Sequence, residues 1–212
     1  MLGILDFDGT IVDSYTIIPS IYKKIQEELK IDGGFVNAML MVEELGDYFG
    51  IFEREKFLRL VLKDQWEYVL EIYWKLRTEN QILLSDAIKF LERYSKTLDL
   101  YLVTSKDDTI DMKKERIKKV GIKKYFKDII IYGERDFEDL NKALEYLYDI
   151  EKECFYIDDK NINLSKIKID IKLFKKIFYP PYPLKLAWNY PEVEYPKILN
   201  LLEIEKYISI YT

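Results

Sequence analysis

Residues 4–14 read ILDFDGTIVDS. This stretch continues a short apolar run that starts at Met1, and it contains two aspartates, Asp6 and Asp8, one residue apart. A short apolar run that stops at Asp-Gly is typical of a buried strand followed by a turn. Two carboxylates this close raise each other's pKa unless a cation lies between them. The stretch therefore predicts a buried strand that ends in a cation-binding acidic pair.

The composition is that of a globular chain. Its 212 residues are enough for one domain and a smaller second one, and 49% of them are hydrophobic. The formal net charge is −5 without a long basic block, and lysines are mixed with glutamates in KKIQEELK and MKKERIKKV, as on solvated helix faces. We expect no nucleic-acid partner. Because no apolar run approaches about 18 residues and no basic residue precedes the first one, we expect neither a membrane span nor a signal peptide.

Two residue types limit the chemistry by their scarcity. Histidine is absent, which excludes an imidazole base and most zinc sites. Cys154 is the single cysteine, which excludes an internal disulfide and favours a cytoplasmic location.

From Ser14 to about Asn80 the apolar pattern is helical throughout. Isoleucine or leucine recurs at every fourth position from Ile17 to Leu29, and Gly33-Gly34 is expected to end that helix. Further helices are predicted over residues 36–48, 53–62 and 65–77.

After Asn80, strand and helix patterns alternate, which predicts a parallel α/β sheet with helices on both faces. We expect strands at 98–105, 128–132 and 153–159, and helices at 85–96, from 107 or 108 to Gly121, and from 136 or 139 to 148. Because five of the six prolines lie between Pro180 and Pro196, that segment is expected to be an irregular surface loop. Residues 195–208 predict an edge strand and a closing helix. Residues 1–13 and 81–212 thus form the predicted α/β domain, and residues 14–80 form a helical insert.

Three predicted strands end in side chains suited to one reaction, and ligands of open parallel sheets bind beyond the carboxyl ends of the strands. Four carboxylates at one edge cannot all stay ionised without a cation, and oxygen ligands without His or Cys indicate Mg²⁺. The side chains are Asp6 and Asp8 after the first strand, Thr104 and Ser105 after the second, and Asp158 and Asp159 after the last.

The motifs DFDGT at 6–10, LYLVTSK at 100–106 and FYIDDKNIN at 155–163 resemble the haloacid dehalogenase superfamily of phosphohydrolases. The helical insert resembles the C1-type cap of the branch that contains phosphoglycolate phosphatase and β-phosphoglucomutase. The resemblance covers nearly the whole chain and is weakest over residues 166–195. It implies a Rossmann-like core with a helical cap, bound Mg²⁺ and an aspartate nucleophile.

The resemblance also implies roles for single residues. Asp6 attacks phosphorus, and Asp8 protonates the leaving alcohol and then deprotonates the hydrolytic water. Thr104 binds a phosphoryl oxygen together with the backbone N–H groups of Phe7 and Ser105.

The metal ligands implied in the same way are Asp6, the backbone carbonyl of Asp8, and Asp159, with Asp158 as an additional ligand. Asn163 replaces an acid of the family pattern and keeps the ability to form a hydrogen bond.

One motif departs from the family pattern. The lysine that precedes the helix before the last of these strands is missing from YGERDFEDLNK at 132–142. Arg135 matches its position, and Lys142 lies two helical turns further on, so the phosphate-binding cation is predicted to be Arg135 or Lys142.

We therefore expect an Mg²⁺-dependent phosphatase of a small phosphorylated metabolite, as a monomer or homodimer. A sugar phosphomutase with the same acids is the close alternative. A non-catalytic interaction protein of the same fold is the alternative from another class.

Overall fold

The structure is a computed structural model and describes residues 1–31, 33–51 and 54–208. Its centre is a six-stranded sheet in the order β5-β4-β1-β6-β7-β8, in which all neighbouring strands run parallel. The predicted parallel α/β sheet is confirmed. The strands are β1 (Leu2–Leu5), β4 (Asp99–Ser105), β5 (Asp128–Tyr132), β6 (Cys154–Asp158), β7 (Lys172–Lys176) and β8 (Lys197–Ile198).

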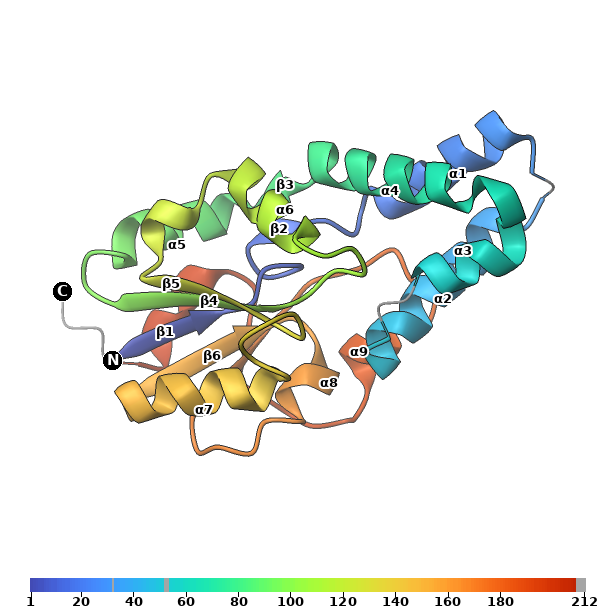
Figure 1. Cartoon of the computed structure of the whole chain (residues 1–212). Coiled ribbons are helices and arrows are strands. Elements are labelled where there is room, and N and C mark those ends of the chain that lie inside the picture. Colours follow the sequence, from blue (N-terminus) through green and yellow to red (C-terminus); the bar gives the residue numbers. More distant parts are fainter. Residues whose placement is uncertain (32, 52–53, 209–212) are drawn as a thin grey trace.

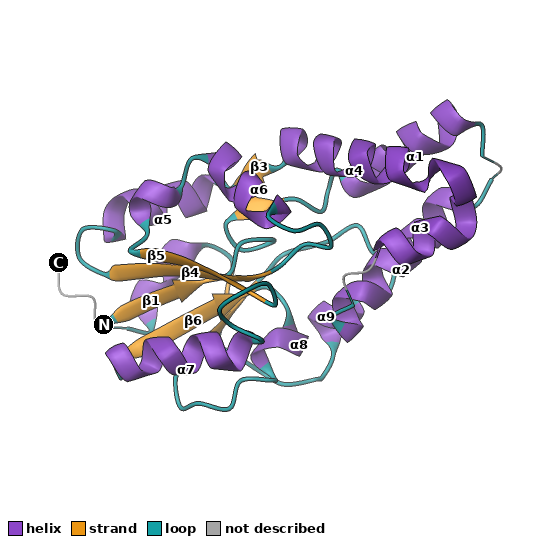
Figure 2. Ribbon diagram, in the orientation of Figure 1, coloured by secondary structure: helices purple, strands orange, loops and turns teal. Residues whose placement is uncertain are grey.

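Helices cover both faces of this sheet (Figures 1 and 2). Alternate residues of one strand enter opposite cores: Leu5 packs in the core with α5, whereas Ile4 packs in the core with α7. The period of two residues follows from the pleat of a strand. The helices of this part are α5 (Ser85–Tyr94), α6 (Met112–Val120), α7 (Leu140–Ile150) and the short α8 (Asn161–Leu164).

The starts of α6 and α7 refine the prediction. Asp139 caps α7, since its Oδ1 accepts a hydrogen bond from the backbone N–H of Lys142 (3.0 Å). Helix α6 starts at Met112, later than expected, after Asp111 in a left-handed conformation (φ 60°). The helix was predicted to start at Asp107 or Asp108. Asp107 instead binds Arg116 and Lys113, and Asp108 binds Arg54.

Four helices extend away from the sheet in Figure 1 and are called the cap from here on. They share their own core, in which Ile21, Ile25, Val69 and Tyr73 are buried. The predicted third helix was expected to start at residue 53, which lies outside the described residues. The cap helices are α1 (Ile18–Leu29), α2 (Phe35–Phe49), α3 (Arg54–Leu62) and α4 (Trp66–Asn80).

A two-stranded antiparallel ladder joins the cap to the sheet domain. It consists of β2 (Val12–Asp13) and β3 (Ile82–Leu83), with Val12 opposite Leu83 and Asp13 opposite Ile82. The predicted domain boundaries at residues 14 and 80 stay a prediction; they lie beside this ladder.

The proline-rich segment differs from the expected surface loop. It contains a short helix, α9 (Leu186–Asn189), and Tyr182, Ala187 and Trp188 are buried in the core of the cap. These apolar side chains find partners there, which the missing periodicity of the segment did not indicate. The predicted edge strand is β8, and the closing helix is a 3₁₀ helix over Leu201–Lys206.

None of the helices formed by the described residues is both long and apolar enough to cross a membrane.

Candidate active site

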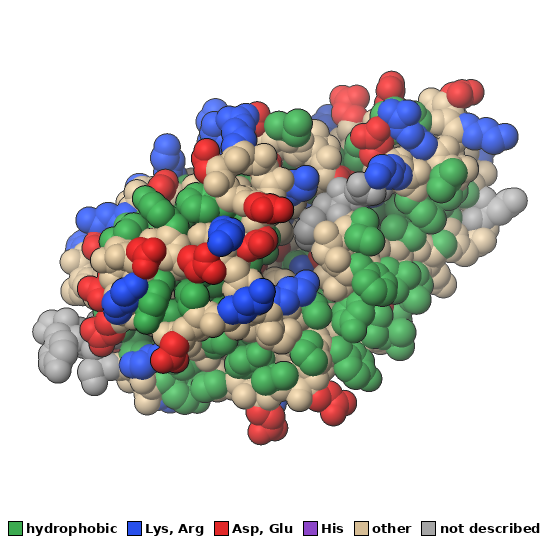
Figure 3. All heavy atoms as spheres, turned by 60° about the horizontal axis from the view of Figure 1, so that its bottom comes forward, with side chains coloured by type: hydrophobic (Ala, Val, Ile, Leu, Met, Phe, Trp, Pro, Cys, Tyr) green, Lys and Arg blue, Asp and Glu red, His purple; other side chains and the backbone are tan. Residues whose placement is uncertain are grey.

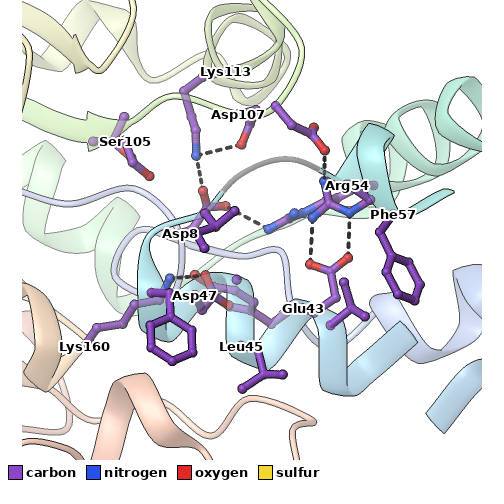
Figure 4. Close-up of a pocket in the computed structure, with 18 of the residues that line it drawn as sticks. Asp8, Glu43, Leu45, Asp47, Arg54, Phe57, Ser105, Asp107, Lys113 and Lys160 are labelled. Carbon is purple, nitrogen blue, oxygen red and sulfur yellow. Dashed lines mark hydrogen bonds and ion pairs between the residues drawn. The ribbon is translucent and has the colours of Figure 1, made fainter. Parts of the chain in front are cut away.

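The three central strands of the sheet bring the predicted acids together. β1 lies between β4 and β6, and Asp6, Thr104, Asp158 and Asp159 at their carboxyl ends are all buried. Asp6, Asp8, Thr104 and Ser105 line a cavity of about 460 Å³ that continues along the cap (Figure 4). The expectation that these strand ends form one site therefore agrees with the structure.

Asp6, Asp158 and Asp159 form a compact cluster of carboxylates. One oxygen from each of the three lies within 4.8 Å of the others. Burial raises the pKa of all three, and the negative charge of Asp158 raises those of Asp6 and Asp159 further. Oδ1 of Asp159 is buried without a hydrogen-bond partner among the described residues. Because the donors are all carboxylate oxygens, this cluster fits a hard divalent cation such as Mg²⁺.

Neighbouring groups hold the carboxylate of Asp158 in this cluster. Asp158 accepts hydrogen bonds from the hydroxyl of Tyr156 (2.6 Å), the backbone N–H of Lys160 (2.8 Å) and the Asn163 side chain (3.0 Å). The predicted hydrogen-bonding ability of Asn163 is thus used. Such partners orient the ligands of a metal and raise its affinity.

The turn after β1 requires glycine for two reasons. Gly9 has a φ of +81°, and a Cβ at this position would lie 2.1 Å from Oδ2 of Asp159. The DGT motif therefore lets the first turn lie directly against the acidic cluster.

The side chain of Asp8 is not part of this cluster and binds cations instead. It accepts hydrogen bonds from Lys113, Arg116 and the hydroxyl of Ser14, and Arg77 lies 3.9 Å from it. Burial alone would raise the pKa of Asp8, but Arg116, Lys113 and Arg77 outweigh burial and hold that pKa well below its usual range. The Asp8 carboxylate is therefore ionised. The predicted contact of the Asp8 backbone carbonyl with the metal stays a prediction.

The structure does not bring the predicted phosphate-binding cations into the cavity. Arg135 pairs with Asp111 at 3.0 Å and its side chain is 63% exposed, and Lys142 pairs with Glu145 at 3.0 Å and is 62% exposed. Neither residue lines the cavity. Both lie at the surface because α7 starts only after Asp139, so the positional match to the family motif does not carry the side chain to the strand ends.

Other cations line the cavity instead, among them the buried lysines Lys113 and Lys160. Lys113 lies on α6 and Lys160 directly follows Asp159, and both side chains are about nine-tenths buried or more. Lys113 was missed because it belongs to the charge-rich MKKERIKKV, which is typical of a solvated helix face.

The cap closes the other side of the cavity with two ion pairs to the sheet domain. Arg54 on α3 binds Glu43 through two hydrogen bonds of 2.7 Å and reaches Asp108 at 2.6 Å. Lys160 reaches Asp47 on α2 at 2.6 Å. These pairs span the cap and the sheet domain (Figure 4).

The entrance of the cavity is apolar. Leu45 and Phe49 on α2 and Leu60 on α3 line the cavity while they are 41%, 63% and 82% exposed. Hydrophobic side chains gather on the surface over the part of the molecule that carries α2 (Figure 3). The cavity thus has a charged floor and an apolar entrance.

The fold and this site define a haloacid dehalogenase-like hydrolase. The family model of that description matches residues 4–166, and the chain belongs to this family. The earlier resemblance is confirmed at the level of the family. No match was found among the curated proteins.

Solved structures of the same fold include proteins of the same superfamily. YfnB from Bacillus subtilis, a HAD-hydrolase bound to magnesium, is 17% identical, with a TM-score of 0.70 over 99% of this chain and 98% of its own. A predicted phosphoglycolate phosphatase from Haemophilus somnus is 14% identical, with a TM-score of 0.64 over 97% and 96%. A HAD phosphatase from Thermococcus onnurineus is 20% identical, with a TM-score of 0.61 over 99% and 98%. At these identities the likeness shows the fold.

Proposed function

We propose that this hydrolase is an Mg²⁺-dependent phosphatase that hydrolyses a small phosphorylated metabolite through an aspartyl-phosphate on Asp6. The observation that carries the proposal is the buried cluster of Asp6, Asp158 and Asp159 at the floor of a cavity lined by Thr104. The phosphatases among the structures of this fold support the same reaction class.

Asp6 is the nucleophile in this proposal. Its carboxylate attacks phosphorus, the bond from phosphorus to the leaving oxygen breaks, and the phosphoryl group is carried on Asp6. The Thr104 hydroxyl, at the end of the neighbouring strand, donates a hydrogen bond to a phosphoryl oxygen. Asp6, Asp158 and Asp159 would hold Mg²⁺, which when bound neutralises charge on the carboxylates and the phosphoryl oxygens.

Asp8 moves the proton in both halves of the reaction. When protonated, Asp8 gives its proton to the leaving alcohol, and the carboxylate that results later takes a proton from the water that hydrolyses the aspartyl-phosphate. The ion pairs with Arg116 and Lys113 keep Asp8 ionised, which favours the second half and opposes the first. Substrates whose leaving oxygen needs little protonation are therefore favoured.

The shape of the cavity supports a small substrate. At about 460 Å³ it has room for a metabolite, and the cap with its ion pairs to Asp108 and Lys160 shields the floor from larger molecules. Its apolar entrance suits the organic part of a phosphate ester.

Hydrolysis of p-nitrophenyl phosphate by the purified chain tests the proposal. We expect release of p-nitrophenol with Mg²⁺, loss of activity in excess EDTA and no turnover by Asp6→Asn, because an amide of the same volume is a poor nucleophile. After denaturation of a quenched reaction, mass spectrometry should find one phosphoryl group on the peptide that contains Asp6. Wild-type rates in EDTA or in Asp6→Asn would refute the mechanism, and a folded wild type without activity on any phosphate ester would favour an interaction protein.

A further inference from the structure

Lys113 is a buried cation at the reactive end of the cavity. Its side chain is 2% exposed, and it lines the same cavity as Asp6 and Thr104. Its Nζ pairs with Asp8 and lies 3.2 Å from Oδ1 of Asp107 (Figure 4). A lysine has three N–H donors. The two pairs account for two of them, and a third partner does not occur within residues 1–31, 33–51 and 54–208.

We propose that Lys113 is the catalytic cation of this phosphatase and contacts an oxygen of the phosphoryl group that is transferred to Asp6. The inference rests on the proposed function. It assigns to α6 the role that the sequence pattern assigned to Arg135 or Lys142.

The charges at the floor of the cavity explain why such a cation is required. Asp6, Asp158 and Asp159 are buried together, and a phosphate ester brings further negative charge to the same place. One divalent cation does not neutralise all of it. A fixed positive charge aimed at the phosphoryl oxygens stabilises the transition state without reorganisation. Burial and the charge of Asp158 raise the pKa of Asp6, and the charges of Lys113 and Lys160 both oppose this rise.

Three other cations of the region have partners of their own. Lys160 donates to Asp47 at 2.6 Å and lies over the rings of Tyr15 and Trp188, so its place depends on the cap. Arg116 is fully buried behind Asp8 and does not line the cavity.

Arg54 lies on the cap side of the cavity. It binds Glu43 and Asp108 with three of its donors. Arg77 also lines the cavity, and its Nε is buried without a hydrogen-bond partner among the described residues, but it lies on α4 of the cap, whereas Lys113 lies on α6 of the sheet domain. Lys113 therefore combines a place in the sheet domain beside Asp8 with an N–H that has no partner among the described residues.

The position of Lys113 in the fold also favours this role. Helix α6 follows β4, the strand that ends in Thr104 and Ser105. The proposed hydroxyl and ammonium donors to the phosphoryl group thus come from one strand–helix unit.

The test compares Lys113→Met with Lys114→Met, the exposed neighbour on the same helix. Two quantities are measured: kcat/KM for p-nitrophenyl phosphate, and the inhibition constant of orthovanadate, which mimics the pentacoordinate transition state. We expect Lys113→Met to lower kcat/KM by about 10²-fold or more and to raise the inhibition constant of vanadate by a similar factor. Lys113→Arg should recover part of both, and Lys114→Met should stay within about twofold of the wild type in each.

A second variant covers the case in which Lys113→Met does not fold. The double variant Asp107→Asn/Lys113→Met removes one acid together with the lysine, so the charge balance of the buried pair is kept. It is compared with the single variant Asp107→Asn. The same loss of vanadate affinity is expected between these two. Lys160→Met tests the alternative that Lys160 is the catalytic cation.

Two results would overturn the assignment of Lys113. One is vanadate affinity within about twofold of the reference after Lys113 is replaced, and the other is a larger loss in Lys160→Met than in Lys113→Met. An active wild type with either result leaves the proposed phosphatase intact, whereas an inactive wild type overturns both proposals.

Discussion

The indole N–H of Trp188 donates a hydrogen bond to Oδ2 of Asp159 across 2.6 Å. Trp188 lies on α9, which packs against α2 of the cap, and Glu44 on α2 accepts hydrogen bonds from the backbone N–H groups of Leu184 and Leu186. A single side chain therefore links the acidic cluster to the proline-rich segment and the cap. The other oxygen of Asp159 stays available to a cation.

Replacement of Trp188 by Phe should weaken metal binding. The change removes the N–H and keeps an aromatic ring, so Asp159 loses an orienting partner while the core stays filled. We expect Mg²⁺ affinity, measured by calorimetry, to fall by about 10-fold or more. Trp66→Phe is the control, because its ring stacks with Arg59 on the cap and not with the cluster. Equal affinity in Trp188→Phe and the wild type would contradict this role.

Gly9→Ala should disable the site. A Cβ at 2.1 Å from Oδ2 of Asp159 displaces the carboxylate or the turn, and a φ of +81° adds a cost of about 1–2 kcal/mol. We expect loss of Mg²⁺ binding, measured by calorimetry, and of phosphatase activity, measured with p-nitrophenyl phosphate. Gly33→Ala, where a Cβ meets nothing within 4 Å, should leave both unchanged. Full Mg²⁺ affinity in Gly9→Ala would contradict the close approach of residue 9 to Oδ2 of Asp159.

The rate should depend steeply on the acidity of the leaving group. Lys113 and Arg116 hold the Asp8 carboxylate in its ionised form, so little proton donation assists the departing oxygen. Across a series of aryl phosphates, we expect kcat/KM to rise as the pKa of the released phenol falls. This ratio reports the first half of the reaction. A flat series would mean that Asp8 protonates the leaving oxygen efficiently.

Glu43 should make the stability of the protein depend on acidic pH. Burial would raise the pKa of Glu43, but Arg54 outweighs it and lowers that pKa from 4.5 to about 2. A carboxyl group whose pKa is lower in the folded than in the unfolded state stabilises the fold at pH values above its unfolded-state pKa. This stabilisation is lost as the pH falls through the folded-state pKa. For this shift the contribution is about 3 kcal/mol. Glu43→Gln should therefore be less stable than the wild type at neutral pH, with a difference that shrinks as the pH falls from 4.5 toward 2.

Urea unfolding at several pH values measures this difference. The control is Glu55→Gln, since Glu55 pairs with Arg59 on the exposed surface, where such pairs contribute about 0–1 kcal/mol. A difference between Glu43→Gln and the wild type that does not change with pH would contradict the lowered pKa.

The acids and Thr104 at the strand ends were predictable because the local sequence pattern shows where a buried strand ends. Apolar runs followed directly by Asp6, Thr104 and Asp158 place those residues at one edge of a parallel sheet, and the structure agrees. The side chains that reach the acids from other elements were not predictable in this way. Lys113 and Trp188 reach the site through the packing of α6 and α9, which depends on contacts between distant segments and leaves no periodic signal.

Arg135 shows the complementary case. Its place in the chain matches the family pattern, but the late start of α7 leaves it at the surface beside Asp111. A match in sequence position fixes neither the register of a loop nor the direction of a side chain.

The β2–β3 ladder has a consequence for protein engineering. Because Asp13 and Ile82 face each other as paired residues, the chain leaves the sheet domain and returns to it at neighbouring points, about 5 Å apart as in any β-ladder. Residues 14–81 thus leave and re-enter the sheet domain at one place, and we expect an exchange of this insert to disturb the sheet least when both junctions lie in the ladder.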